Sequence, residues 1–257
     1  MNRPVVYAHR GASGYAVENT IPSFELAIKM KADAVEFDVQ LLSDGEVVVF
    51  HDFDLNRLFS VDRHISVLTA QDLKEYTFPD ARIPLLSEVL DVIGHRIAMN
   101  IELKLWSVDP SVLRRLCARV LELVEARGLM HDVVVSSFNR EALRQMRELS
   151  DEISMAVLVD DLSKDDAHAQ GQGRTLAFYI KTARDMRSYA INISYTLADA
   201  RVVQDIHGAG LHVNVYTIND DDLMRTVLRK GVDGFFTNYP DRAVAMVRRM
   251  LDMPPPP

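Results

Sequence analysis

The chain has 257 residues, of which 48% are hydrophobic and 26% charged, a composition typical of soluble globular enzymes with one large core. Its formal net charge of -8 argues against general binding of nucleic acid or of anionic membranes. Stable membrane insertion is not expected, because no apolar run approaches the roughly 18 residues that a membrane helix needs. A small anionic substrate stays compatible with this charge, because the local field of a pocket can oppose the global charge.

The single cysteine, Cys117, excludes an internal disulfide and fits a reducing compartment, so we expect a cytoplasmic protein. Cys117 shares an apolar stripe with Leu113 and Val120, which favours a small buried hydrophobe over a nucleophile. We also expect no signal peptide, because the first predicted strand begins by Val5 and a candidate catalytic residue, His9, follows it at once.

Extended apolar runs alternate with helical patterns along the chain, which predicts βαβ units and a parallel sheet. Thr20 precedes a helix with Pro22 in its first turn, and Asp109-Pro110 opens a helix that stops near Gly128. The nine predicted strands span 4–8, 34–42, 46–51, 97–104, 133–138, 154–159, 190–194, 212–218 and 234–237.

Later segments give weaker signals. The residues from Thr196 to Asp199 resemble a capping box, and Gly231 fits a helix C-terminal cap. Residues 53–84 are interpreted as a small insertion over the barrel mouth, with one helix near 70–76. Residues 160–175 are interpreted as a mobile loop, and 254–257 as a short frayed proline tail. We expect one domain over 1–257.

Nine strands are one too many for a closed (β/α)8 barrel. The run from Leu42 to Glu46 contains Asp44-Gly45, a hairpin turn, and parallel strands cannot be joined across such a turn. We therefore predict that 46–51 returns antiparallel to 34–42. The fold expected is a (β/α)8 TIM barrel with a hairpin extension after strand two, which places His51 near Asp38.

Polar residues gather where predicted strands end. Because strand side chains alternate faces, Glu36 and Asp38 point the same way, and so do Asn100, Glu102 and Lys104. Burying unpaired charge costs free energy, so these groups are expected to meet one another, a cation and an anionic substrate. In TIM barrels the active site lies at this end of the strands.

The residue types indicate metal-assisted phosphodiester chemistry. Glu36, Asp38 and Glu102 offer oxygen ligands suited to one divalent cation, Mg²⁺ or Ca²⁺. His9 and His51 are a candidate acid–base pair, since histidine titrates near neutral pH. Arg10 and Lys104 are expected to hold phosphate oxygens, and Lys104 can also pair with Glu102 or Asp38.

The order and spacing of these motifs resemble the glycerophosphodiester phosphodiesterases, in their bacterial cytosolic form. The resemblance runs from residue 4 to about 243, and the segment 139–211 adds little to it. The motifs that carry it are His9-Arg10-Gly11, Glu18-Asn19-Thr20, Glu36-x-Asp38, Ser43-Asp44-Gly45, His51-Asp52, Glu102-x-Lys104, Ser136-Ser137-Phe138, Val215-Tyr216-Thr217-Ile218-Asn219 and Gly231-Val232-Asp233-Gly234.

The resemblance implies a TIM barrel that hydrolyses diesters such as glycerophosphocholine to glycerol 3-phosphate and an alcohol, through a cyclic phosphate intermediate. It implies the metal, acid–base and phosphate roles given above, and a role for Glu18 in orienting Arg10 or a histidine. Three positions depart from the family pattern: Tyr216 replaces tryptophan, Leu85 a threonine and Asn238 an acid. Tyr216 shares a face with Asn214 and can still line the pocket as a substrate-binding residue.

Three alternatives remain open. A lysophospholipase D or phospholipase C-like enzyme would need an apolar entrance, which six apolar residues of the insertion could supply. Glycoside hydrolysis is disfavoured, because it needs no phosphate clamp. A non-catalytic barrel that acts as a binding protein is disfavoured by the complete polar set. Headgroup, metal and oligomeric state stay open. The apolar residues of the insertion are Phe53, Leu55, Leu58, Phe59, Val61 and Ile65.

Overall fold

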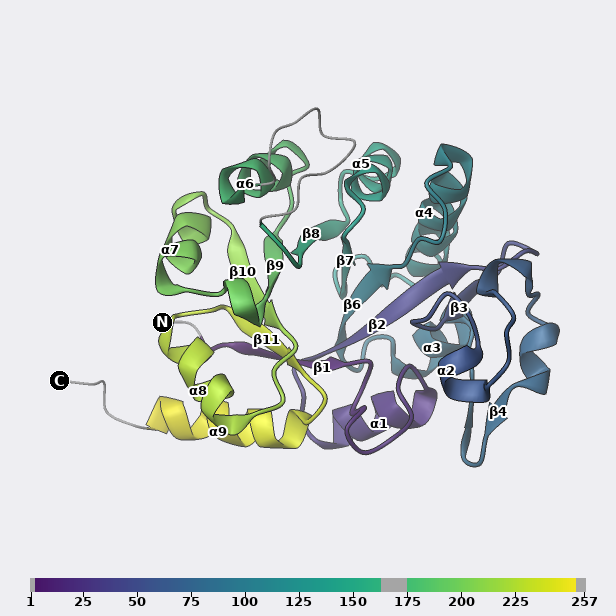
Figure 1. The fold of residues 1–257 in the computed structure, drawn as a ribbon, viewed down its shortest axis with the longest axis horizontal. Coiled ribbons are helices and arrows are strands. Elements are labelled where there is room, and N and C mark those ends of the chain that lie inside the picture. The colour runs from purple at the N-terminus through teal and green to yellow at the C-terminus, as the bar shows by residue number, and fades with distance from the viewer. Residues whose placement is uncertain (1–2, 163–174, 253–257) are drawn as a thin grey trace.

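The computed structural model describes residues 3–162 and 175–252, and in these ranges eight parallel strands close into a barrel (Figure 1). Each barrel strand pairs with its neighbour in chain order, and β1 closes the ring by pairing with both β2 and β11. The barrel strands are β1 Val5–His9, β2 Ala34–Leu41, β6 Ala98–Leu103, β7 Val133–Ser137, β8 Ser154–Val159, β9 Ala190–Ser194, β10 His212–Tyr216 and β11 Gly234–Thr237.

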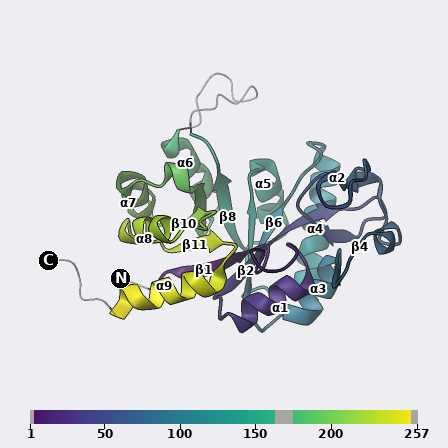
Figure 2. The same cartoon turned by 60° about the horizontal axis from the view of Figure 1, so that its bottom comes forward.

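Helices follow the strands and surround the barrel, as Figures 1 and 2 show. Outward-facing strand residues such as Val35 and Phe37 pack beneath them, and the Phe37 ring lies 5.3 Å from that of Phe24 on α1. The predicted (β/α)8 fold is therefore confirmed. The helices are α1 Ile21–Lys29, α2 Asn56–Phe59, α3 Leu86–Ile93, α4 Pro110–Glu125, α5 Arg140–Leu149, α6 Leu176–Asp185, α7 Ala200–Gly208, α8 Asp221–Arg229 and α9 Pro240–Asp252.

The predicted hairpin after strand two is present. Strand β3 (Val47–Val49) pairs antiparallel with β2, with Val39 opposite Val49. The pairing continues past β3, because the Phe50 amide donates to the Asp38 carbonyl at 3.0 Å. Gly45 in the turn has φ +89°, a conformation that glycine adopts without steric cost. The hairpin thus carries His51 back toward Asp38, as predicted.

The insertion at 53–84 packs with the hairpin into a second small core. Figure 1 shows the insertion beside β3. Its elements are α2, the 3-10 turns η1 Ile65–Val67 and η2 Asp72–Glu75, and the two-stranded sheet of β4 Thr77–Phe78 and β5 Ala81–Arg82. The helix predicted near 70–76 is present as the short 3-10 helix η2. Thr69 and Asp72 hold its start, because the Thr69 amide donates to Asp72 Oδ2 at 2.8 Å and the Asp72 amide donates to Thr69 Oγ1 at 3.2 Å, and extended β4 begins at Thr77.

Most helix boundaries follow the predicted caps. Thr20 and Asp109 are N-caps whose side chains accept from Ser23 and Ser111 backbone amides. The capping box predicted to start at Thr196 is wrong. Asp199 itself caps α7 by accepting from two backbone amides, and Thr196 lies in the 3-10 turn η3 Tyr195–Leu197. A carboxylate next to the first helical residue competes better for those amides than a hydroxyl one turn earlier.

Other sequence expectations have mixed outcomes. Cys117 is fully buried, as predicted. The loop predicted at 160–175 falls mostly outside the described residues, and so does the proline tail at 254–257. Among the residues that the structure describes, no helix is both long enough and apolar enough to cross a membrane.

Candidate functional site

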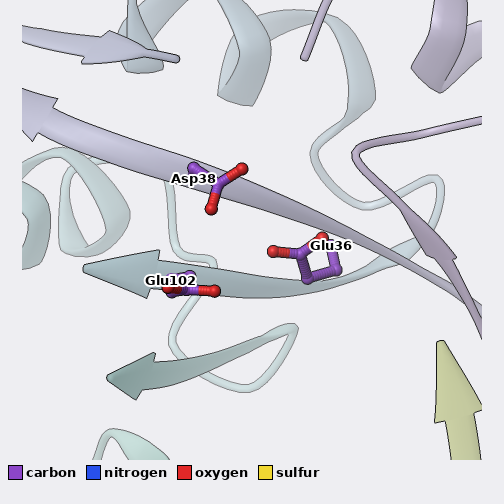
Figure 3. A group of neighbouring side chains, drawn as sticks. All are labelled: Glu36, Asp38 and Glu102. Carbon is purple, nitrogen blue, oxygen red and sulfur yellow. The ribbon is translucent and has the colours of Figure 1, made fainter. Parts of the chain in front are cut away.

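Three carboxylates meet at the C-terminal end of the barrel. Glu36 and Asp38 come from β2 and Glu102 from β6, and Asp38 is in register with Glu102 across the two strands. Their ligand oxygens all lie within 4.8 Å of one another, and all three side chains are buried (Figure 3). Strand alternation places them here, since the intervening Phe37 faces the helices. The structure thus brings together the three residues that the sequence singled out for metal binding.

The pKa values of this cluster reflect buried like charges. Burial first, and then the Asp38 and Glu102 charges, raise the pKa of Glu36 well above its usual range. Burial and the Asp38 charge raise the pKa of Glu102 to about 7. Burial alone would also raise the pKa of Asp38, but the charges of Arg10 and Lys104 hold it below its usual range. A cation bound among these carboxylates would offset their mutual repulsion and stabilise their ionised forms.

Both predicted histidines line the same cavity of about 220 Å³ as Glu36 and Glu102. His9 Nδ1 lies 2.7 Å from Asn238 Oδ1, and His51 Nδ1 lies 2.7 Å from Asp52 Oδ1. Because both partners are acceptor oxygens, each Nδ1 carries a proton, and Nε2 is the nitrogen left to accept or donate a proton in a reaction. Burial lowers the pKa of His9 to about 4, and burial also lowers that of His51.

Arg10 and Lys104 are held beside the carboxylates. Arg10 Nη1 donates to Glu18 Oε1 at 2.9 Å, and its Nε lies 3.3 Å from Asp38 Oδ2. A guanidinium has five N–H donors, more than these contacts use, so phosphate oxygens can bind alongside. Lys104 Nζ lies 2.9 Å from Glu102 Oε1 and 3.7 Å from Asp38 Oδ1, so the ion pairing considered for Lys104 is present.

Backbone geometry fixes the position of Arg10. Arg10 has φ +54° and accepts the Asn19 amide on its carbonyl, while its own amide donates to Glu36 Oε2 at 3.0 Å. A β-carbon on the following Gly11 would lie 2.4 Å from Ser23 Oγ, so only glycine fits there. The strained conformation of Arg10 is therefore imposed by its surroundings and directs the guanidinium at the cluster.

Tyr216 forms part of an aromatic wall of the cavity. Its ring is edge-on to Phe138 at 6.0 Å and to Phe236 at 6.4 Å. The Tyr216 hydroxyl is buried, and among the described residues it makes no hydrogen bond. The predicted pocket position of Tyr216 is thus observed, with a hydroxyl available to a polar ligand.

Sequence reasoning missed three supporting residues. Asn19 Nδ2 donates to Asp38 Oδ2 at 2.9 Å. Asn19 belongs to the motif Glu18-Asn19-Thr20, for which the sequence suggested a function only for Glu18. Asn238 was noted only as a departure from the family pattern, yet it holds His9. Asp52 follows His51 directly and fixes its ring; the adjacent pair was the available signal.

Three other histidines pair with carboxylates away from His9 and His51. His95 pairs with Asp132 on the surface, and His207 and His212 both pair with Asp233. None of these three lines the cavity that holds the carboxylates. His168 lies outside the described residues.

The family model of the glycerophosphoryl diester phosphodiesterases matches residues 9–242. A glycerophosphodiester phosphodiesterase of Bacillus altitudinis is 33% identical over 95% of this chain and 98% of its own length. One from Bacillus subtilis is 30% identical over 93% of this chain and 85% of its own.

Solved structures agree with the sequence comparisons. A phosphodiesterase of Oleispira antarctica, in complex with the product sn-glycerol-3-phosphate, has a TM-score of 0.80 at 29% identity and covers 95% of this chain and 97% of its own. A glycerophosphodiester phosphodiesterase of Thermotoga maritima has a TM-score of 0.76 at 29% identity, over 96% of this chain and 99% of its own. Together with the family match over nearly the whole chain, these likenesses show that the chain belongs to the glycerophosphoryl diester phosphodiesterase family.

Proposed function

We propose that this chain hydrolyses glycerophosphodiesters to glycerol 3-phosphate and an alcohol, with the help of one divalent cation. The observation that carries the proposal is the convergence of three buried carboxylates, two histidines, an arginine and a lysine at one end of the barrel. The product-bound relative from Oleispira antarctica supports the choice of substrate class.

The residues present fit a divalent cation. The donors are carboxylate oxygens within 4.8 Å of one another, which suits Mg²⁺ or Ca²⁺ and not a soft metal. The raised pKa values of Glu36 and Glu102 indicate buried charge that a cation would neutralise. Glu36, Asp38 and Glu102 would hold the ion. When bound, the cation supplies Lewis-acid stabilisation of charge on the phosphate oxygens.

The other polar residues divide the remaining work. Arg10 and Lys104 bind the phosphate. Glu18 orients Arg10 by accepting a hydrogen bond from its guanidinium, and Asp38 by an ion pair with it. A substrate hydroxyl on the glycerol attacks phosphorus, one histidine Nε2 accepts its proton, and the bond to the leaving alcohol breaks. The other histidine enters this step protonated at both ring nitrogens and donates its Nε2 proton to the leaving oxygen. Water then opens the cyclic phosphate with the proton transfers reversed.

Substrate orientation follows from the shape of the cavity. The aromatic wall of Tyr216, Phe138 and Phe236 is apolar enough to contact the carbon face of glycerol, and the free Tyr216 hydroxyl can bind one glycerol oxygen. The leaving alcohol would then face an adjoining open pocket of about 550 Å³. This pocket shares His51 and Lys104 with the cavity and is also lined by Asp52, Phe53 and Arg57. A cytoplasmic location is part of the proposal, since the one cysteine is buried and unpaired.

The proposal is tested by following glycerophosphocholine with ³¹P NMR in the presence of Mg²⁺ or Ca²⁺. We expect the diester signal to be replaced by that of glycerol 3-phosphate, with a transient five-membered cyclic phosphate signal. Formation of phosphocholine instead of glycerol 3-phosphate would place the cleaved bond on the wrong side of phosphorus and contradict the proposal.

A second candidate is lysophospholipase D activity, favoured by a human relative, lysophospholipase D GDPD1, that is 33% identical over 54% of this chain. The insertion gives it limited support. Leu55 and Ile65 are buried in the insertion's own core with Leu58, Phe59 and Val61 packed against them, and Phe53 is 42% exposed. We therefore expect glycerophosphocholine to be turned over faster than lysophosphatidylcholine, and the reverse order would favour the second candidate.

A further inference from the structure

Arg57, on α2 of the insertion, connects two residues of the site from outside the reaction cavity. Its Nε donates to Asp52 Oδ2 at 2.6 Å. Its Nη2 and Nη1 donate to Glu18 Oε1 and Oε2 at 2.6 and 3.2 Å. One guanidinium thus uses three N–H groups on two carboxylates, the geometry in which arginine binds most strongly.

Each of these carboxylates holds a proposed reactive group with its other contacts. Asp52 Oδ1 accepts from His51 Nδ1 at 2.7 Å, and Glu18 Oε1 accepts from Arg10 Nη1 at 2.9 Å. Arg57 is the link that joins these two pairs. A continuous chain of charge-assisted hydrogen bonds therefore runs over the barrel mouth from His51 to Arg10.

The charges in this chain depend on Arg57. Burial alone would raise the pKa of Glu18, and the hydrogen bond from Arg57 is the largest of the effects that hold it below its usual range. The same holds for Asp52, where burial is also the first effect and Arg57 the largest opposing one. In return, the hydrogen bond with Glu18 raises the pKa of Arg57. Arg57 thus stabilises the ionised form of both carboxylates, which is the form that accepts from His51 and Arg10.

We propose that Arg57 is a positioning residue, which fixes His51 and Arg10 relative to each other by holding Asp52 and Glu18 with a single guanidinium. The inference rests on the proposed function, which gives His51 and Arg10 their tasks. Arg57 does not line the cavity of the carboxylates, and three of its guanidinium N–H groups are used by Asp52 and Glu18, so we infer that it acts through these two partners.

The first test is steady-state kinetics of Arg57→Lys and Arg57→Ala with glycerophosphocholine. A lysine ammonium keeps the charge but cannot span both carboxylates. Misplacement of a catalytic group by about 1 Å can cost on the order of 100-fold. We expect kcat to fall about 10- to 100-fold in both variants, with KM changed less than about threefold.

Arg63 offers a matched control in the same insertion. Its guanidinium donates to Tyr76 and Asp72, both within the insertion, at 3.2 and 3.4 Å. Arg63→Ala removes an arginine side chain and its two hydrogen bonds from the same insertion without touching the chain that leads to His51. We expect its turnover to stay near that of the unmodified protein, even where its melting temperature falls as much as that of Arg57→Ala.

A double-mutant cycle locates the effect. If Arg57 acts through Glu18, the combined loss in Glu18→Gln/Arg57→Ala should fall well short of the product of the two single losses. Multiplicative losses would overturn the proposal. So would normal turnover of Arg57→Lys, equal loss in the Arg63→Ala control, or a rise in KM with unchanged kcat, which would make Arg57 a substrate-binding residue.

A readout without turnover separates this inference from the proposed function. In ¹⁵N NMR, His51 of the unmodified protein is expected as the Nδ1–H tautomer, held by Asp52. In Arg57→Lys we expect a mixture of tautomers, because Asp52 loses its second anchor. Unchanged His51 signals would overturn the inference, even where the unmodified protein proves inactive on every glycerophosphodiester, a result that would overturn the proposed function alone.

Discussion

At the scale of single residues, the site is dominated by carboxylates that repel one another. Glu36, Asp38 and Glu102 were predictable from strand alternation, because residues two apart on a strand share a face. Their supports were not predictable in the same way. Asn238 is 229 residues from His9 in sequence, and no local pattern connects them.

The raised pKa of Glu102 predicts how stability changes with pH when no metal is present. The folded pKa of about 7 exceeds the unfolded value, so the native state binds this proton more tightly. The contribution of Glu102 to the free energy of unfolding is therefore fully present below about pH 4.5 and is lost as pH rises through about 7. Relative to Glu102→Gln, the chelated protein should become less stable over this window.

Urea denaturation of both proteins, from pH 5 to pH 8 in chelator, checks this prediction. The comparison with Glu102→Gln cancels the opposite effect of His9, whose lowered pKa makes stability rise with pH in the acidic part of the window. Glu102→Gln is expected to be no less stable than the unmodified protein at pH 8. A large loss of stability in the variant at that pH would contradict the account.

The two histidines should each matter for turnover. His9→Ala and His51→Ala are expected to lower kcat by roughly two to four orders of magnitude, the usual range for a positioned acid or base. The double variant should lose far less than the product, because groups that act as a unit are not additive. Initial-rate measurements decide this, with His95→Ala as a surface control. Near-normal turnover of either single variant would remove that histidine from the mechanism.

At the scale of elements, the sequence predicts a turn most reliably where the backbone geometry of that turn requires a particular residue. Asp44-Gly45 identified the hairpin because two adjacent strands with a short turn must be antiparallel. The failed prediction, the capping box at Thr196, concerns a single turn whose ends are set by competing hydrogen bonds. Asp199 accepts from the Arg201 and Val202 amides, so the deciding hydrogen bonds are local, and the sequence pattern alone did not distinguish the two possible caps.

The hairpin gives a prediction about Gly45. Its φ of +89° is poorly tolerated by a β-branched residue, so Gly45→Val should distort the turn that returns His51 to the site. We expect kcat to fall by a larger factor than the folding equilibrium constant does, although residue 45 lies outside the cavity. Kinetics combined with urea denaturation measure both effects.

Gly128 supplies the matched control. It has φ +67°, and a β-carbon there would meet nothing within 4 Å, so Gly128→Val carries a similar backbone cost far from His51. Its stability should fall while kcat stays near normal. An equal effect of the two substitutions on kcat would show that the hairpin turn has no special influence on His51.

At the scale of the whole molecule, barrel closure explains why the residues of the site could be predicted from the sequence. All parallel strands end at the same mouth, so polar groups at the ends of β1, β2 and β6 must meet. The bridge from Arg57 to Glu18 depends instead on how the insertion packs over that mouth. The sequence predicts the insertion over the mouth, but not which side chains meet there, because these contacts follow from how the insertion packs with the hairpin in a second core.

The most direct test of the central claim is an assay of glycerol 3-phosphate release from glycerophosphocholine, run in chelator and after addition of Mg²⁺ or Ca²⁺. The account predicts no release in chelator, full recovery on addition of the cation, and no recovery at the same cation concentration in Asp38→Asn. Undiminished release by the chelated protein, or recovery in Asp38→Asn equal to that of the unmodified protein, would contradict it.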